Sequence, residues 1–242
     1  MTGGSITVTP NKHSRPGAAP KSARRRRTGQ AGPVRSNRRA KPERPTGGRA
    51  LVTFEKLVKA AGELLAEVGF EKLTSNEICA RAKLTPPAFY HYFNNKYDIL
   101  EELAETLLKK QSDAFAIWLF QNAGRAEGAA QIDALELWFR TAADIVAKEP
   151  GGIWTMRALR ALPNLAHIRL QSQRLFTDQM LEFARRMMPE TRAKTLWNQL
   201  RIAAEFGFIV DELALEEDRI PRDILFKEAA RLMHGVIDEI RG

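Results

Sequence analysis

The side chains best suited to contact nucleic acid lie between residues 85 and 96. One expected helix presents hydroxyl, imidazole and small apolar groups on its exposed side, at Thr85, Pro86, Ala88, Tyr90, His91 and Tyr92. Hydroxyl and imidazole groups can bond phosphates or base edges, and proline and alanine carbons can meet a thymine methyl. Lys96 opens a further helix, where its ammonium and the helix N-terminus could both face a phosphate. This combination predicts binding to double-stranded DNA.

Two short helices are expected to position these groups. Thr74 and Glu77 fit a capping box at the start of the first helix. Thr85 is a suitable N-cap for the second helix, and prolines at its first two positions lose no intrahelical hydrogen bond. An amphipathic helix over about 51–68 precedes them, and Gly69, just past its end, suits a left-handed cap. The pattern is a helix-turn-helix, whose second helix enters the major groove. The alternative from spacing alone is a tight helical hairpin with aromatic core residues.

Three blocks of residues here match a known family pattern. They are Leu73-Thr74-Ser75 with Glu77-Ile78, then Ala82-Lys83-Leu84-Thr85, then Phe89-Tyr90-His91-Tyr92-Phe93-Asn94-Asn95-Lys96 with Leu100. These blocks resemble the signature of TetR-type (TetR/AcrR) transcriptional regulators. The resemblance covers residues 50–100, and beyond them it is one of layout only. It implies an N-terminal three-helix DNA-binding domain followed by a larger helical domain.

The resemblance also implies roles for single residues. The positions that match phosphate contacts are Thr74, Ser75, Asn76, Tyr90, Tyr92 and Lys96. The first three of these also meet a base on occasion. The positions that match the base-facing part of the recognition helix are Thr85, Pro86 and Ala88, and His91 faces the groove between the two tyrosines.

Two residues depart from the family pattern. Lys83 stands where the turn usually has glycine, and a left-handed backbone there would cost lysine about 1 kcal/mol more than glycine. Ala88 stands where threonine or serine is common, so one hydroxyl is missing from the groove-facing set. Specificity is therefore expected to depend more on His91, Asn76 and apolar contacts.

The remainder of the chain reads as helical throughout, so the expected fold class is all-α. Apolar periodicity predicts helices over about 130–148, 152–161, 164–188, 190–215 and 221–241, after a long helix that begins near Asn95. The expected domains are a helix-turn-helix domain at 50–96 and a helical effector-binding and dimerisation domain at 97–242.

By resemblance, the second domain forms a homodimer through the helices at 190–215 and 221–241. The apolar faces assigned to this interface comprise Leu196, Leu200, Ala203, Ala204, Gly207 and Val210 on the first helix and Ile224, Leu225, Ala229, Leu232, Val236 and Ile240 on the second. The alternative is that the apolar faces of these helices are intramolecular core. The resemblance also implies an apolar effector site among the middle helices, with candidate lining residues Phe115, Trp118, Trp138, Trp154, Phe176 and Met180. Most such side chains are ordinary core in any helical protein. A polar anchor could come from Arg140, Arg157, Arg160 or His167.

The positive charge of the chain is concentrated in its first 49 residues. This segment holds 13 Lys or Arg and one acid, a net of +12, whereas residues 50–242 hold 25 Lys or Arg and 28 acids, a net of −3. It has no aromatic residue and cannot bury enough apolar surface to fold, so we expect a disordered basic arm at 1–49. The arm could contact DNA phosphates, serve as a targeting segment, or have no defined role.

Several function classes are not supported by the sequence. No run approaches the roughly 18 apolar residues of a membrane span. The only cysteine, Cys79, falls on an inward helix face, and the four histidines have no ligand-type spacing. No phosphate loop or hydrolase motif is present. We therefore expect neither an enzyme nor a metal or cofactor site.

The sequence as a whole indicates a ligand-responsive repressor. It would bind a near-palindromic operator as a homodimer and be released by an apolar small-molecule effector, in the cytoplasm and associated with the nucleoid. The alternative is a sequence-tolerant or architectural DNA-binding protein that has no effector.

Overall fold

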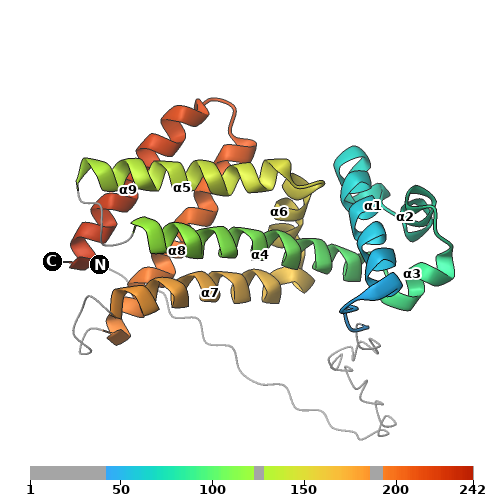
Figure 1. Ribbon diagram of the computed structural model, residues 1–242. Coiled ribbons are helices and arrows are strands. Elements are labelled where there is room, and N and C mark those ends of the chain that lie inside the picture. Colours follow the sequence, from blue (N-terminus) through green and yellow to red (C-terminus); the bar gives the residue numbers. More distant parts are fainter. Residues whose placement is uncertain (1–41, 123–127, 186–192, 242) are drawn as a thin grey trace, which may run out of the picture. The chain divides into compact units, whose positions relative to one another are not determined.

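The computed structural model describes residues 42–122, 128–185 and 193–241, and every regular element in these ranges is helical. Residues 1–41, most of the predicted basic arm, lie outside them. The elements are α1 (Gly48–Lys72), α2 (Ser75–Ala82), α3 (Pro86–Tyr92), α4 (Lys96–Asn122), α5 (Ala129–Lys148), α6 (Gly152–Ala161), a 3₁₀ turn (Pro163–Leu165), α7 (Ala166–Arg185), α8 (Ala193–Glu216) and α9 (Arg222–Arg241) (Figure 1). The all-α prediction is confirmed.

Helix α1 forms the base on which the two short helices pack. Its predicted apolar stripe faces inward, and Phe54, Leu57 and Leu65 are buried. The chain leaves helical geometry at Gly69, whose φ of 73° lies in the left-handed region that glycine tolerates. One more helical turn follows. The predicted stop at Gly69 is thus confirmed as a break, although the helix assignment continues to Lys72.

The ends of α2 and α3 are set by local sequence signals. The Glu77 N–H donates to Thr74 Oγ1 at 3.2 Å, and the Thr74 hydroxyl donates to Glu77 Oε2 at 2.9 Å, as a capping pair should. Lys83 ends α2 with φ 56° and ψ 43°, which is the left-handed conformation considered from the sequence. The Leu84 N–H then donates to the Cys79 carbonyl at 2.9 Å and closes the turn.

Replacement of Lys83 by glycine is expected to raise the free energy of unfolding by about 1 kcal/mol, because the left-handed conformation is unstrained only without a Cβ. Denaturant titration of the variant and the natural chain measures this difference. Lys83→Ala is the matched control, since it removes the charge but keeps the Cβ. Equal stabilisation by both substitutions would show that the lysine side chain, and not the backbone, is responsible.

The start of α4 directly follows α3 and is fixed by polar side chains. Asn95 Oδ1 accepts hydrogen bonds from the N–H groups of Tyr97 at 2.8 Å and Asp98 at 3.3 Å. The Asp98 carboxylate accepts in return from the Asn94 N–H at 2.9 Å. Ile99 at the beginning of α4 and Phe115 near its end are both buried. One continuous helix therefore runs from the helix-turn-helix segment through the C-terminal helices.

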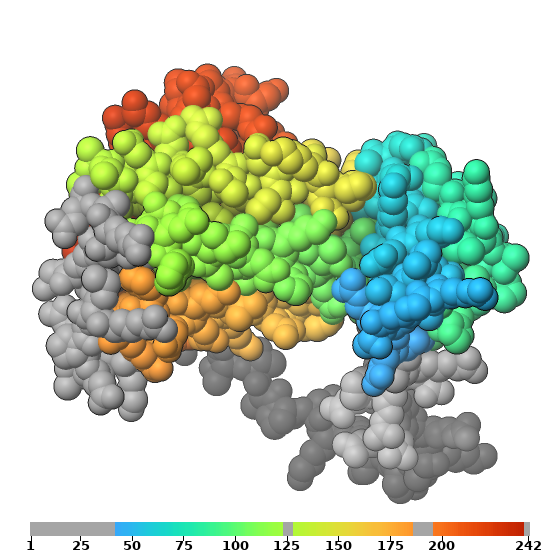
Figure 2. All heavy atoms as spheres, in the orientation of Figure 1, coloured from blue at the N-terminus to red at the C-terminus, as the bar shows by residue number. Residues whose placement is uncertain are grey.

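The C-terminal helices pack around α4. Helices α4, α5 and α7 lie side by side (Figure 1) and cover one face together in the space-filling view (Figure 2). Helix α9 packs against α5, and α8 packs against both α7 and α9. The predicted helix boundaries in this part agree with the structure to within a few residues.

Helix α6 joins the C-terminal helices to α1 through backbone contacts. A Cβ on Gly62 of α1 would lie 2.6 Å from the Pro150 carbonyl oxygen, and one on Gly151 would lie 2.6 Å from the Gly62 carbonyl oxygen. Gly151 also has φ 71°. Since only glycine allows this approach, movement of the α6 N-terminus would be transmitted to α1.

The described chain begins inside the segment that composition assigns to the arm. Helix α1 starts at Gly48, two residues before the predicted boundary. Arg44 lies against the helical body: its Nη1 is 3.0 Å from Glu102 Oε1, and its guanidinium lies 5.6 Å from the Phe54 ring centroid. The C-terminal end of the basic segment is therefore fixed to the domain that it precedes.

Candidate DNA-binding site

The predicted DNA-contact residues lie at the start of α2 and along α3. Those that are exposed or half-buried are Thr74, Ser75, Asn76, Thr85, Pro86, Ala88, Tyr90 and His91. The Thr85 backbone has N-cap geometry, but its hydroxyl makes no capping bond and is available to another partner. The fold thus brings these groups to the surface of two adjacent helices, and their contact with DNA stays a prediction.

A hydrogen bond between side chains connects the two helices at this surface. Ser75 Oγ at the start of α2 lies 3.1 Å from the Tyr90 hydroxyl on α3. The Tyr90 side chain is 55% exposed, and its ring lies edge-on to Phe89 at 5.4 Å. Because a tyrosine hydroxyl both donates and accepts, the pair holds a donor at the surface beside the α2 N-terminus.

The prediction that Tyr92 lies on the exposed side of its helix is wrong. Tyr92 is buried, and its ring packs edge-on against Phe54 of α1 at 5.7 Å. With Phe89 and Phe93 it forms the inward face of α3, at the three- and four-residue spacing of a buried helical stripe. A helix this short, packed on α1, leaves only its other side for DNA.

Lys96 contacts the C-terminal end of α1. Its Nζ donates to the Phe70 carbonyl oxygen at 3.1 Å and lies 4.3 Å from the centre of the Phe70 ring. The break at Gly69 leaves backbone carbonyl groups near the C-terminal end of α1, and these contacts place the Lys96 ammonium beside them. Lys96 therefore connects α4 to α1, and its predicted role at a phosphate is a separate contact that the structure does not test.

The sequence analysis missed an ion pair that joins α2 to α1. Arg81 of α2 forms a bidentate ion pair with Glu67 of α1: its Nη1 and Nη2 donate to Glu67 Oε1 and Oε2 at 2.8 and 2.6 Å. Its Nη1 also lies 3.7 Å from Glu63 Oε2. The hydrogen bond from Arg81 lowers the pKa of Glu67. The partners lie on different helices, so helical spacing gave no signal for the pair.

Cys79 is buried at 2% exposure, as predicted, and burial raises the pKa of its thiol, which disfavours the reactive thiolate.

Among the described residues, no cluster of three or more His, Cys, Asp or Glu side chains has the geometry of a metal site. No helix in the described ranges has the length and apolar character needed to cross a membrane.

Four of the predicted effector residues form one aromatic cluster. The Phe115 ring lies 5.7 Å from Trp118, 4.9 Å from Trp138 and 5.0 Å from Phe176. Trp118 Nε1 donates to the Ala134 carbonyl at 2.9 Å. Met180, half-buried, packs against the same core. The rings contact one another in the manner of a packed core.

Trp154 does not belong to this cluster, and its prediction as a neighbour of the other tryptophans is wrong. It is 37% exposed on α6, next to Gly69 of α1, and Arg157 lies 5.1 Å from the centre of its ring. The first turn of α6 faces α1, so this side chain lies beside the helix-turn-helix segment.

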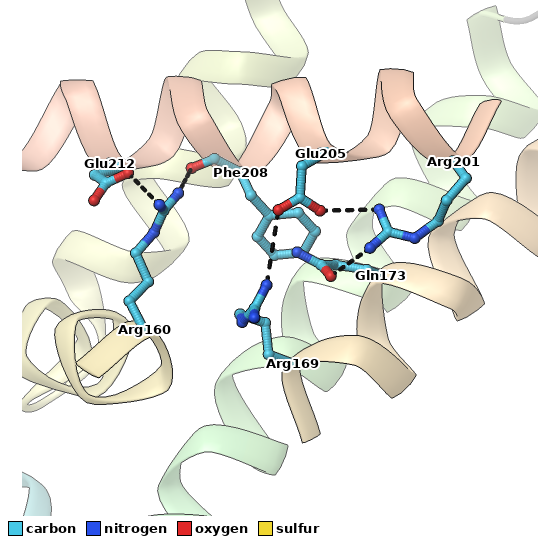
Figure 3. Close-up of polar contacts among 7 residues, drawn as sticks. All are labelled: Arg160, Arg169, Gln173, Arg201, Glu205, Phe208 and Glu212. Carbon is cyan, nitrogen blue, oxygen red and sulfur yellow. Dashed lines mark hydrogen bonds and ion pairs between the residues drawn. The ribbon is translucent and has the colours of Figure 1, made fainter. Parts of the chain in front are cut away.

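A small, partly open pocket lies elsewhere, between α6, α7 and α8, with α4 beneath it. Its lining residues are Leu108, Met156, Leu159, Arg160, Arg169, Gln173, Glu205 and Phe208. None of the six predicted effector residues lines it, but Arg160, considered as a polar anchor, does. Figure 3 shows the polar network around this pocket. The apolar periodicity used for the prediction could not find a pocket whose lining combines apolar and polar side chains from four helices.

The faces predicted for dimerisation are divided between core and surface. On α8, Leu196, Leu200, Ala203 and Val210 are buried within the chain, as are Leu225 and Ala229 on α9. Those residues are intramolecular core, so their assignment to an interface is wrong for the chain as described. Other apolar side chains on these helices are exposed: Ile202, Ile209, Ile224, Leu232 and Val236.

Comparison with known proteins connects the helix-turn-helix segment to a family. The model of bacterial regulatory proteins of the tetR family matches residues 57–103. The class G tetracycline repressor protein of Vibrio anguillarum is 44% identical over 55 residues, which cover 22% of this chain and 26% of that protein. The chain thus matches about a quarter of the length of this relative.

Solved structures share the fold over most of the chain. A tetR-family transcriptional regulator from Streptomyces coelicolor has a TM-score of 0.59 at 18% identity, covering 78% of this chain and 82% of that one. The Thermus thermophilus repressor FadR, solved with lauroyl-CoA, has a TM-score of 0.51 at 20% identity, covering 74% and 92%.

The segment that matches the family model coincides with the observed helix-turn-helix. Residues 57–103 include most of α1, all of α2 and α3, and the start of α4, which together form the helix-turn-helix domain. The proteins that it resembles are described as regulators and repressors. Residues 57–103 therefore form an N-terminal domain of the tetR family of bacterial regulatory proteins.

Proposed function

We propose that the protein is a homodimeric transcriptional repressor that binds a near-palindromic operator through α2 and α3 and is released by a small-molecule effector. The observation that carries the proposal is the exposed polar surface of α2 and α3 within the segment that matches the family. In this arrangement α3 lies in the major groove, with His91 and Thr85 toward base edges. Ser75 and Tyr90 bond phosphates and set the register of the helix on the duplex.

Helix α6 is the proposed connection between an effector site and the DNA. It lines the pocket through Met156, Leu159 and Arg160, and its N-terminal end abuts α1 at Gly62. A ligand that prefers one position of α6 would change the orientation of the helix-turn-helix domain. Such a ligand changes the affinity for DNA only if its own affinity differs between the two orientations of the helix-turn-helix domain.

A second copy of the chain is the proposed occupant of the exposed apolar surface of α8 and α9. Ile202 and Ile209 are 73% and 41% exposed, and Leu232 and Val236 are 63% and 43% exposed. Each pair has the spacing of one helix face. A Cβ at Gly235, beside Leu232 and Val236, meets no atom within 4 Å, so this part of α9 is open to close approach.

The second candidate is a DNA-binding protein without an effector. The observation that favours it is the aromatic cluster around Phe115, whose rings contact one another where an apolar effector cavity was expected. Binding of lauroyl-CoA by the structural neighbour FadR favours the effector-responsive alternative. Measurement of operator affinity with and without bound effector separates the two.

Tyr90→Phe is expected to weaken binding to operator and random DNA alike, by roughly fivefold, which is the value of about one net hydrogen bond. The effect is general because phosphates are the same along the duplex. Fluorescence anisotropy with both DNAs measures it. The matched control is Tyr97→Phe, since Tyr97 lies on α4 outside the proposed surface. Equal affinities for the natural chain and the Tyr90 variant would contradict the proposed position of α3.

A further inference from the structure

The pocket between α6, α7 and α8 has an apolar floor and a polar rim. Leu108, Met156, Leu159 and Phe208 supply the apolar part. The polar part consists of Arg160 from α6, Arg169 and Gln173 from α7, and Glu205 from α8, as Figure 3 shows. Such a combination fits a small molecule that has one polar end and one apolar end.

Two hydrogen-bond donors at this pocket have no acceptor among the described residues. Gln173 is fully buried; its Oε1 accepts from Arg201 Nη2 at 2.7 Å, but its Nε2 has no partner. The Nε of Arg169 is also buried and unpaired. Buried donors are nearly always paired, because an unpaired donor loses its hydration without compensation. Two of them on residues that line one pocket indicate an acceptor that the described part of the chain does not supply.

The charges around the pocket favour an anionic acceptor. Arg160 is paired with Glu212 at 2.6 Å and donates to the Phe208 carbonyl at 3.4 Å. Arg201 pairs with Glu205 at 2.9 Å. Arg169 has only a 3.7 Å contact with the same Glu205. One carboxylate is thus shared by two guanidinium groups, and Arg169 is the less tightly paired of them.

We propose that this pocket binds the carboxylate of a small organic acid. One carboxylate oxygen accepts from Gln173 Nε2 and from Arg169 Nε, and the apolar part of the acid lies against Met156 and Phe208. This rests on the proposed effector-responsive function and specifies the chemical class of its effector. A guanidinium and an amide N–H together select a carboxylate over a neutral carbonyl, because hydrogen bonds to charged groups are stronger.

The first test compares an acid with its neutral amide on the full-length protein. Isothermal calorimetry is carried out with acetate, butyrate, hexanoate and octanoate, and with hexanamide as the uncharged match to hexanoate. At least one acid is expected to bind saturably, and hexanamide to bind roughly tenfold or more weakly than hexanoate. Equal binding of hexanoate and hexanamide, or no saturable binding by any of the four acids, overturns the proposal.

The second test uses two variants of the pocket and one control. Gln173→Glu keeps an acceptor for Arg201 but replaces the unpaired donor with a negative charge, so acid binding should be lost. Arg169→Gln should weaken it roughly tenfold through loss of the charged donor. Lys148→Gln, on α5 away from the pocket lining and paired with Asp144 at 3.2 Å, should leave it unchanged. Unchanged acid binding in both pocket variants contradicts the assignment, and thermal unfolding of each variant verifies that it is folded.

Binding of DNA is measured in parallel on the same proteins. If the natural chain and the pocket variants bind DNA equally but no acid binds, the pocket assignment fails while DNA binding stands. If an acid binds and no DNA binds, the proposed regulatory function fails and the carboxylate site stands.

Discussion

Replacement of Asp211 by asparagine is expected to make the protein more stable at pH 8, by an amount on the order of 4 kcal/mol at about 1.4 kcal/mol per pKa unit. Asp211 lies on α8 and is 4% exposed. Burial raises the pKa of its carboxyl from 3.8 to about 7, although a hydrogen bond donated by Gln111 Nε2 at 2.9 Å acts in the opposite direction. At pH 8 the folded chain must therefore hold a poorly solvated negative charge.

The direction of the pH dependence follows from the raised pKa. Between pH 3.8 and about 7 the folded chain holds the proton on Asp211 and the unfolded chain releases it, so stability falls as the pH rises through this range and then levels off. At pH 4 the natural chain and the variant should be nearly equally stable.

Urea titrations of both proteins from pH 4 to pH 8 measure the difference. Asp133→Asn, which removes an exposed carboxyl from α5, is the matched control and should change stability little at any pH. A constant difference between the Asp211 variant and the natural chain across this range would mean that Asp211 is already ionised in the fold at pH 4.

Introduction of a charge at Ile202 or Val236 is expected to yield monomers that bind the operator about 10²–10⁴-fold more weakly, because the gain from linking two DNA-binding domains is lost. Both side chains are exposed within one chain, so Ile202→Glu and Val236→Glu should not disturb the fold itself. Light scattering and operator titration measure the two effects.

The matched control for the dimer is Ile117→Glu, which places the same charge at a 60% exposed isoleucine on α4. This variant should stay dimeric and bind DNA normally. If the natural chain is a monomer that binds the operator tightly, or if the α8 and α9 variants stay dimeric, the proposed interface is wrong.

Local signals allowed much of the fold to be predicted. The capping pair of Thr74 and Glu77, the break at Gly69 and the left-handed Lys83 depend on neighbours in sequence, and all three are observed. The exposed groups of α3 were found from the helix pattern, which fixes which residues share a face, whereas those at the start of α2 came from the family resemblance.

Features that depend on tertiary packing could not be predicted in this way. A pattern shows that a face is apolar but not what covers it, so Leu200 and Val210 of α8 were assigned to a dimer interface although they are buried within the chain. Tyr92 was misplaced for a different reason: its three-residue spacing from Phe89 indicates the inward face of α3, but its hydroxyl was assigned to the exposed side. The pocket combines Arg160, Arg169 and Glu205 from three helices, and no spacing in the sequence relates them.

Selection of bound duplexes from a random pool tests whether α3 reads DNA sequence as one half of a dimer. With the full-length protein we expect an enriched motif with two-fold symmetry, whose half-sites are centred about 10 base pairs, or a multiple of this, apart. With His91→Ala, preference should be lost at a symmetric pair of positions within that motif and be retained elsewhere. Recovery of no enriched sequence, or of an identical motif with the His91 variant, would contradict the proposed role of α3.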